Sequence, residues 1–131
     1  MNEELKNQPY SVLIVDDEPT NIEFLLEVFE ILESWRVHAT ASPREALDIY
    51  RDNVLSLVLL DITMPEMDGF EVLDEFSKIA VAKPPVVYVL TGHHDAQTRE
   101  KAIQKGAYDV ITKPFTVDAI IELVERIQAK S

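Results

Sequence analysis

The sequence predicts an α/β fold in which a parallel sheet carries helices on both of its faces. Short, continuously apolar runs alternate with longer amphipathic runs along the 131 residues. A continuously apolar run is typical of a strand that is buried on both faces, and strands that alternate with helices are typical of parallel sheets. Hydrophobic residues are 47% of the chain and charged residues 27%, the composition of a folded domain of this length.

Five apolar runs have the length and composition of strands. Leu57–Leu60 and Val86–Leu90 are continuously apolar, as expected at the centre of a sheet. Arg36–Ala39 alternates between polar and apolar residues, which indicates a shorter strand. In chain order, the predicted strands are Ser11–Val15, Arg36–Ala39, Leu57–Leu60, Val86–Leu90 and a short one at Val110-Ile111.

An amphipathic run follows each strand and predicts a helix there. Ser42 followed by Glu45 has the pattern of a capping box, in which each side chain bonds the backbone N–H of the other residue. Gly106 is placed to end a helix in the left-handed conformation. The predicted helices are Thr20–Leu32, one beginning at Ser42, Gly69–Ala80, one from a cap at Asp95 to about Lys105, and Thr116–Ala129.

Composition excludes several classes of protein. No apolar run reaches the roughly 18 residues of a membrane helix, and the polar start MNEELKNQPY does not resemble a secretory signal. The absence of cysteine excludes disulfides, thiolate nucleophiles and cysteine metal sites, and fits a cytoplasmic protein. The net charge of −12 disfavours direct binding to nucleic acid or anionic lipid and favours divalent cations and basic protein surfaces, although solubility alone also explains it.

Chemically active residues follow the predicted strands. Ligands of open parallel sheets bind outside the carboxyl ends of the strands, and these ends lie at one edge. The residues delivered to that edge are Asp16, Asp17 and Glu18, then Asp61, then Thr91 and Gly92, then Lys113 and Pro114.

Clustered carboxylates repel one another unless a cation lies among them. Mg²⁺ prefers oxygen ligands and takes only a few carboxylates. A carboxylate beside Mg²⁺ and a fixed lysine can attack a phosphoryl group to give an aspartyl phosphate. Lys113 would then offset charge on the transferred oxygens, and Thr91 could donate a hydrogen bond to one of them.

The same residues resemble the signature of response-regulator receiver domains, the CheY-like superfamily of two-component signalling. The resemblance runs from about Tyr10 to about Ala129 and rests on four segments: Asp16-Asp17-Glu18, Asp61 to Gly69, Thr91-Gly92 and Lys113-Pro114-Phe115. It implies a flavodoxin-like, doubly wound sheet of five parallel strands in the order 2-1-3-4-5, with five helices. It also implies a receiver domain at 10–131 after an N-terminal extension at 1–9.

The resemblance assigns a role to each site residue. Asp61 matches the phosphoacceptor, Asp17 a direct Mg²⁺ ligand, and Asp16 a residue that supports the metal through water. The backbone carbonyl of Thr63 would complete the protein's ligands to the metal. Thr91 matches the switch hydroxyl, and Lys113 matches the lysine that pairs with the phosphoryl group. The resemblance also implies a cis peptide between Lys113 and Pro114. The implied phosphoryl-binding residues are Thr63, Thr91, Gly92 and Lys113.

The implied function is a signalling switch in a phosphorelay, and not a turnover enzyme. A sensor histidine kinase or a histidine phosphotransfer protein would supply the phosphoryl group, and a surface of the fourth helix, fifth strand and fifth helix would read it out to a downstream target or output domain. Val110 stands where the family often has a switch aromatic, so we expect the signal to depend on the segment from Thr91 to Lys105.

Several alternatives remain open. Each acidic or polar residue could belong to an ordinary helix start or turn, and His93 and His94 are expected to be solvated loop residues. An aspartyl-phosphate phosphohydrolase would place its nucleophile after the first strand, where this chain has Asp16-Asp17-Glu18. A flavin or nucleotide carrier would need a glycine-rich loop there, and the chain has only three glycines. An inactive receiver used for docking would not need the acceptor, the acidic pair and the lysine.

Overall fold

The computed structural model describes residues 9–64, 67–92 and 95–130 of the chain. Apart from Pro9, the predicted N-terminal extension lies outside these residues, and so do Pro65, Glu66, His93 and His94. Within the described residues no helix is both long enough and apolar enough to cross a membrane.

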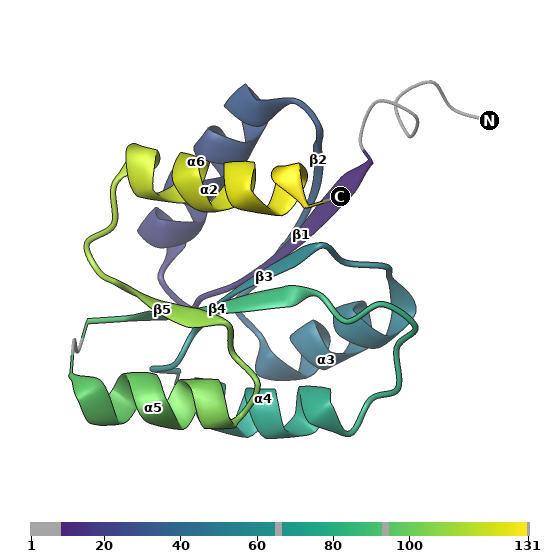
Figure 1. The fold of residues 1–131 in the computed structure, drawn as a ribbon, viewed down its shortest axis with the longest axis vertical. Helices are drawn as coiled ribbons and strands as arrows, with labels where there is room; N and C mark the ends of the chain where they lie inside the picture. Colours follow the sequence, from purple (N-terminus) through teal and green to yellow (C-terminus); the bar gives the residue numbers. More distant parts are fainter. Residues whose placement is uncertain (1–8, 65–66, 93–94, 131) are drawn as a thin grey trace.

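Strands and helices alternate through the described residues (Figure 1), as the sequence predicts. The strands form one parallel sheet in the order β2-β1-β3-β4-β5, which confirms the predicted fold class. In chain order the elements are β1 (Tyr10–Val15), α2 (Pro19–Leu32), β2 (Trp35–Thr40), α3 (Pro43–Asp52), β3 (Leu57–Asp61), α4 (Gly69–Ser77), β4 (Val86–Thr91), α5 (Ala96–Gln104), β5 (Asp109–Thr112) and α6 (Val117–Ala129).

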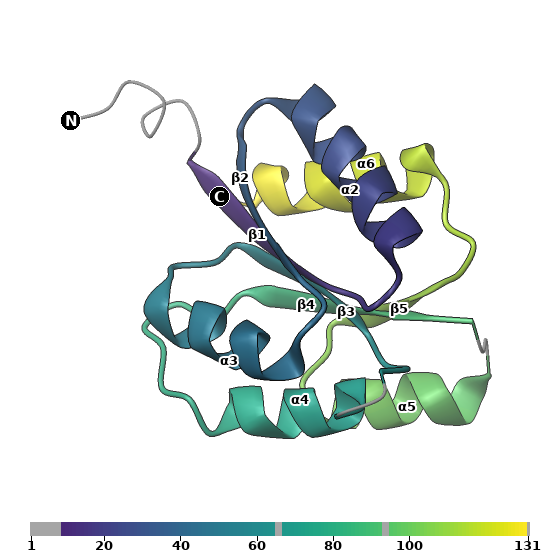
Figure 2. The same cartoon turned by 180° about the vertical axis from the view of Figure 1, so that it is seen from behind.

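Helices cover both faces of the sheet, with α2 and α6 on one side and α3, α4 and α5 on the other (Figures 1 and 2). The middle strand β3 serves both cores. Leu57 and Leu59 pack into the cluster that includes α2 and α6, whereas Val58 and Leu60 pack into the cluster that includes α3 and α4. All four are fully buried, which explains why this strand is continuously apolar rather than alternating.

The helix starts agree with the predicted caps, with one correction. The side chains of Ser42 and Asp95 accept hydrogen bonds from the backbone N–H groups of Glu45 (3.2 Å) and Thr98 (2.7 Å). The capping box at Ser42 is only half formed, because the Ser42 N–H donates to the Thr40 hydroxyl at 3.0 Å instead of to Glu45. A hydroxyl on the strand before the helix therefore replaces the expected glutamate.

Helix α4 ends at Ser77, three residues before the predicted end at Ala80. The Lys78 N–H bonds the Glu75 carbonyl and the Ile79 N–H bonds the Phe76 carbonyl, so the last turn tightens to the spacing of three residues. The chain then leaves the helix axis, and Ile79 packs against the core beneath the sheet.

The first residue of α4, Gly69, touches the end of β3. A Cβ added at Gly69 would lie 2.5 Å from the Cα of Ile62 and 2.8 Å from the carbonyl oxygen of Asp61. The Gly69 N–H also donates to the Ile62 carbonyl at 3.0 Å. The start of α4 therefore packs directly against the backbone of Asp61 and Ile62, and only glycine fits at position 69.

We expect Gly69→Ala to lower the free energy of unfolding by about 2–3 kcal/mol, because the clash is with backbone that cannot swing aside. Urea unfolding measures the difference. Gly92→Ala is the matched control, since an added Cβ there meets nothing within 4 Å. Equal midpoints for the two variants would contradict the close approach.

Candidate functional site

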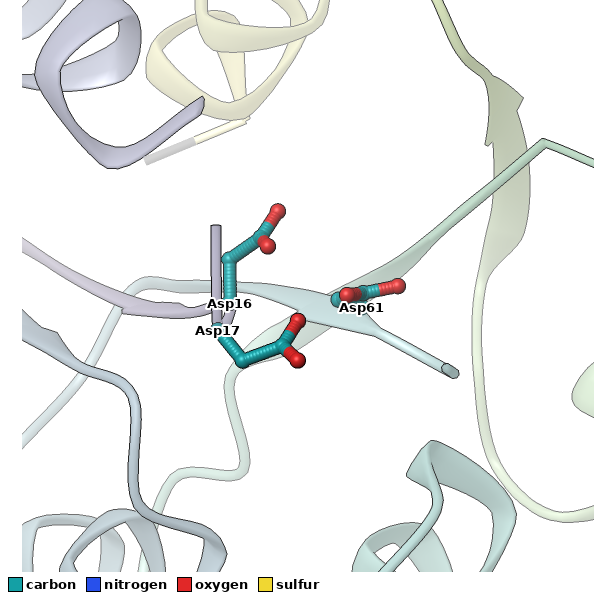
Figure 3. A group of neighbouring side chains, drawn as sticks. All are labelled: Asp16, Asp17 and Asp61. Carbon is teal, nitrogen blue, oxygen red and sulfur yellow. The ribbon is translucent and has the colours of Figure 1, made fainter. Parts of the chain in front are cut away.

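Three carboxylates meet at the carboxyl edge of the sheet (Figure 3). Asp16 and Asp17 follow β1 and Asp61 ends β3, which lies beside β1 in the sheet. One oxygen from each side chain lies within 4.8 Å of the others. Asp16 is 0% exposed and Asp61 is 2% exposed, whereas Asp17 is more open to solvent. The structure thus brings together the acidic residues that the sequence places after two different strands.

The buried carboxylate of Asp16 is held by three donors. Its Oδ1 accepts from the Glu18 N–H at 2.9 Å. Its Oδ2 accepts from the Asn21 side-chain amide at 3.2 Å and from Lys113 Nζ at 3.2 Å. A carboxylate without water around it needs such partners to remain charged.

Lys113 links the two buried carboxylates. Its Nζ lies 3.2 Å from Asp16 Oδ2 and 3.5 Å from Asp61 Oδ1. Its backbone N–H donates to the Thr91 carbonyl at 2.7 Å, which fixes the loop after β5 to the end of β4. The peptide bond between Lys113 and Pro114 is cis.

Burial raises the pKa of Asp61 from 3.8 to about 6. A hydrogen bond from the Thr63 N–H, 3.0 Å from Asp61 Oδ1, acts in the opposite direction. Within the same overall shift, the charges of Asp16 and Asp17 also raise the pKa, and the Lys113 ammonium lowers it. Burial, with the two neighbouring carboxylates, therefore outweighs the Thr63 hydrogen bond and the Lys113 ammonium.

The donor set fits Mg²⁺. It consists of carboxylate oxygens from three residues close enough to share one ion, with Asp17 on the more open side. Mg²⁺ is a hard cation that takes one or two carboxylates and leaves its other positions to water and phosphate oxygens. A divalent cation here would also relieve the repulsion that raises the Asp61 pKa.

The other predicted residues lie at the same edge. In the register of β3 and β4, Asp61 is paired with Leu90, so Thr91 lies one residue farther toward the edge, where it is fully buried. Thr63 follows Asp61 by two residues and is exposed, as is Gly92.

Val110 lies in β5 and packs, half-buried, against the core beneath the sheet. The nearby aromatic Tyr108 is 54% exposed, and its ring centroid lies 5.5 Å from that of Tyr88. Position 110 therefore offers a small aliphatic side chain, and the nearest aromatic in sequence is more than half exposed and packs at the edge of the core, against Tyr88.

Sequence reasoning missed Asn21. This residue lies in the first turn of α2 and is half-buried beside Asp16. The available signal was an amide side chain five residues after Asp16, at the start of a helix that follows the strand directly.

The raised pKa makes the stability of the metal-free protein depend on pH. The Asp61 carboxyl has a pKa of about 6 when folded and 3.8 as its ordinary value. The folded chain therefore binds the proton more tightly, and the free energy of unfolding falls as pH rises from 3.8 to about 6.

We expect Asp61→Asn to be more stable than the unsubstituted chain by about 1–3 kcal/mol near pH 8 in buffer with a chelator. The amide keeps the shape of the side chain and removes the buried charge. The difference should shrink as pH falls to about 4.5, where the carboxyl of the folded chain is neutral. Urea unfolding at both pH values measures it, and a difference that does not change with pH would contradict this account.

Comparison with known proteins agrees with this geometry. Residues 12–125 match the family model described as the response regulator receiver domain. The regulatory protein AtoC of Escherichia coli K12 is 35% identical over 115 residues, which cover 88% of this chain and 24% of AtoC. The chain thus spans about a quarter of the length of that relative.

Solved structures show the same fold. The chemotaxis protein CheY4 of Vibrio cholerae superposes with a TM-score of 0.83 at 23% identity, over 90% of this chain and 98% of CheY4. A chain of the CheX–CheY–BeF3–Mg²⁺ complex from Borrelia burgdorferi superposes with a TM-score of 0.80 at 29% identity, over 90% of this chain and 88% of that one. The family match covers most of the chain and both strand ends that carry the carboxylates. The chain belongs to the response regulator receiver domain family.

Proposed function

We propose that this chain accepts a phosphoryl group on Asp61 and acts as a switch, with a sensor histidine kinase or a histidine phosphotransfer protein as the donor. The observation that carries the proposal is the position of the Asp61 side chain, which lies 3.5 Å from Lys113 Nζ within a cluster of three carboxylates. The Borrelia complex, one chain of which resembles this one, contains BeF3 and Mg²⁺, and this supports the same chemistry here.

Asp16, Asp17, Asp61 and the backbone carbonyl of Thr63 would hold the metal. Bound Mg²⁺ would offset negative charge on the phosphoryl oxygens. The backbone of Thr63 already lies close to Asp61, because its N–H donates to Asp61 Oδ1. That hydrogen bond also fixes the orientation of the carboxylate that would react.

The transfer step uses Asp61 as nucleophile. A carboxylate oxygen of Asp61 attacks the phosphorus of a phosphohistidine, the P–N bond breaks, and the imidazole leaves with the electron pair of that bond. Lys113 turns from Asp16 and Asp61 to a phosphoryl oxygen, where Thr91 and the backbone at Gly92 also bind. Hydrolysis of the acyl phosphate by water releases inorganic phosphate and regenerates the Asp61 carboxylate, which returns the chain to its starting state.

The readout surface in this proposal consists of α5, β5 and α6. Helix α5 buries only Ala102 among its described residues. Lys105 bonds Asp74 on α4 at 2.9 Å, and Arg99 bonds Asp109 on β5 at 2.8 Å. Exposed ion pairs contribute only about 0–1 kcal/mol each, so α5 can shift at small cost when Thr91 rearranges.

We assign residues 10–131 to the receiver domain and 1–9 to an extension, and we place the chain in the cytoplasm. The charge of −12 favours basic protein surfaces as partners and disfavours direct contact with nucleic acid or membrane. The downstream target, or an output domain fused to the receiver, would therefore be recognised through protein contacts.

Intact-mass spectrometry after incubation with acetyl phosphate tests the phosphoacceptor. We expect one phosphoryl adduct that requires Mg²⁺ and disappears in Asp61→Asn. Asp68→Asn is a suitable control, because Asp68 caps α4 and lies outside the carboxylate cluster. A folded, unsubstituted chain that binds Mg²⁺ and forms no adduct would instead indicate a docking module.

Hydrogen exchange tests the readout. We expect BeF3 with Mg²⁺, a mimic of the phosphoryl group, to change amide exchange from Thr91 to Lys105, because this segment joins the switch hydroxyl to the weakly buried α5. The central strand β3 serves as the internal reference. Unchanged exchange in that segment, with BeF3 bound, would rule out α5 as the moving element.

A further inference from the structure

We propose that Asn21 is a positioning residue for this reaction: its side-chain amide fixes the Asp16 carboxylate so that the metal site keeps its geometry when Lys113 turns to the phosphoryl group. This inference rests on the proposed function and adds to it a residue outside the acidic cluster. Asn21 contributes no carboxylate and acts through Asp16.

The first turn of α2 holds both oxygens of Asp16. The Glu18 N–H donates to Oδ1 at 2.9 Å, and the Asn21 amide donates to Oδ2 at 3.2 Å. The backbone N–H of Asn21 in turn bonds the Glu18 carbonyl at 3.1 Å, so the two donors belong to one rigid turn. With one donor on each oxygen, the carboxylate cannot rotate about its Cβ–Cγ bond without losing hydrogen bonds.

When Lys113 turns to the phosphoryl group, Asp16 Oδ2 loses one of its donors. Lys113 Nζ and the Asn21 amide share Asp16 Oδ2, each at 3.2 Å. Asp16 is 0% exposed, so water cannot readily replace a lost donor. Leaving a buried charged acceptor unpaired is more costly than a typical hydrogen bond is favourable. Asn21 keeps a donor on this oxygen after the lysine has gone, and so makes the departure of Lys113 less costly.

The orientation of the Asp16 carboxylate affects how tightly the site would bind Mg²⁺. An oxygen of Asp16 lies within 4.8 Å of oxygens of Asp17 and Asp61, and this arrangement requires a defined orientation of each carboxylate. Residues that orient metal ligands from behind typically change metal affinity by about 10–100-fold when they are replaced. Asn21 orients Asp16 in this way, whereas Lys113 would also have to bind the phosphoryl group.

A merely structural role for Asn21 predicts a different result. The residue could stabilise the start of α2 without influencing the metal. Alanine is the best helix former, so Asn21→Ala removes the amide without weakening the helix backbone. If Asn21→Ala lowers the magnitude of the free energy of Mg²⁺ binding by more than it lowers the free energy of unfolding, Asn21 is a positioning residue and not merely a structural one.

The experiment compares the unsubstituted chain, Asn21→Ala and Asn21→Leu, the last of which keeps the approximate size of the side chain and also lacks a donor. Asn53→Ala is the matched control, because the Asn53 amide likewise donates one hydrogen bond, to the Ile49 carbonyl at 3.0 Å, but at the end of α3. Titration calorimetry gives the Mg²⁺ dissociation constant, and urea unfolding in chelator gives the stability. Mass spectrometry gives the rate of phosphorylation by acetyl phosphate as a function of Mg²⁺.

We expect both Asn21 variants to bind Mg²⁺ about tenfold more weakly, while Asn53→Ala binds like the unsubstituted chain. The phosphorylation rate should require correspondingly more Mg²⁺ and recover most of its value at saturation. Unchanged Mg²⁺ affinity in a folded Asn21 variant would overturn the inference, and so would an equal loss in Asn53→Ala. If the unsubstituted chain itself binds no Mg²⁺ and forms no adduct, the proposed function fails, and this outcome is distinct from failure of the Asn21 inference alone.

Discussion

The ammonium group of Lys113, set between two buried carboxylates, is the contact on which the site depends. Asp16 and Asp61 are both nearly excluded from water, and Lys113 Nζ lies 3.2 Å from one and 3.5 Å from the other. Charges buried without partners are very costly, so this arrangement is stable only if the fold brings β1, β3 and the loop after β5 to one place. The lysine and Asp16 are 97 residues apart, and the parallel sheet joins them. The charge pattern of the site therefore requires this fold.

The residues of this edge differ in how far they could be predicted. Asp16 and Asp61 each follow a continuously apolar run directly, so strand prediction alone places them together. Lys113 follows a short strand whose residues are only half-buried, so the apolar pattern predicts its place at this edge from only two residues, Val110 and Ile111. The contact of Asn21 with Asp16 depends on how α2 leaves β1 and on one side-chain rotamer, and neither is visible in an apolar pattern.

The same limit explains the errors in local structure. The apolar spacing of α4 continues past Ser77, because Ile79, which is partly buried, still packs against the core although the backbone has left the helix. The half-formed capping box at Ser42 reflects a competitor, the Thr40 hydroxyl, which belongs to the preceding strand. Gly69 begins a helix as predicted, but the requirement for glycine there is steric and comes from the return of the chain to Ile62. In each case a contact between elements decided what periodicity could not.

The close packing of Gly69 against the backbone of Asp61 and Ile62 has a mechanical consequence. Backbone packed against backbone at this distance is stiff, so α4 and the end of β3 behave as one body. Helix α5 lies beside α4 on the same face of the sheet; it buries only Ala102 among its described residues, and its contact with α4 includes the long, flexible side chain of Lys101, whose Nζ lies 4.2 Å from the centre of the Phe70 ring. Asp61, the proposed phosphoacceptor, thus has one stiff neighbour and one compliant neighbour, and in the proposed switch a change at Asp61 would displace mainly the compliant one. In the proposed switch, a difference in stiffness between two adjacent helices would then set the direction in which the signal leaves Asp61.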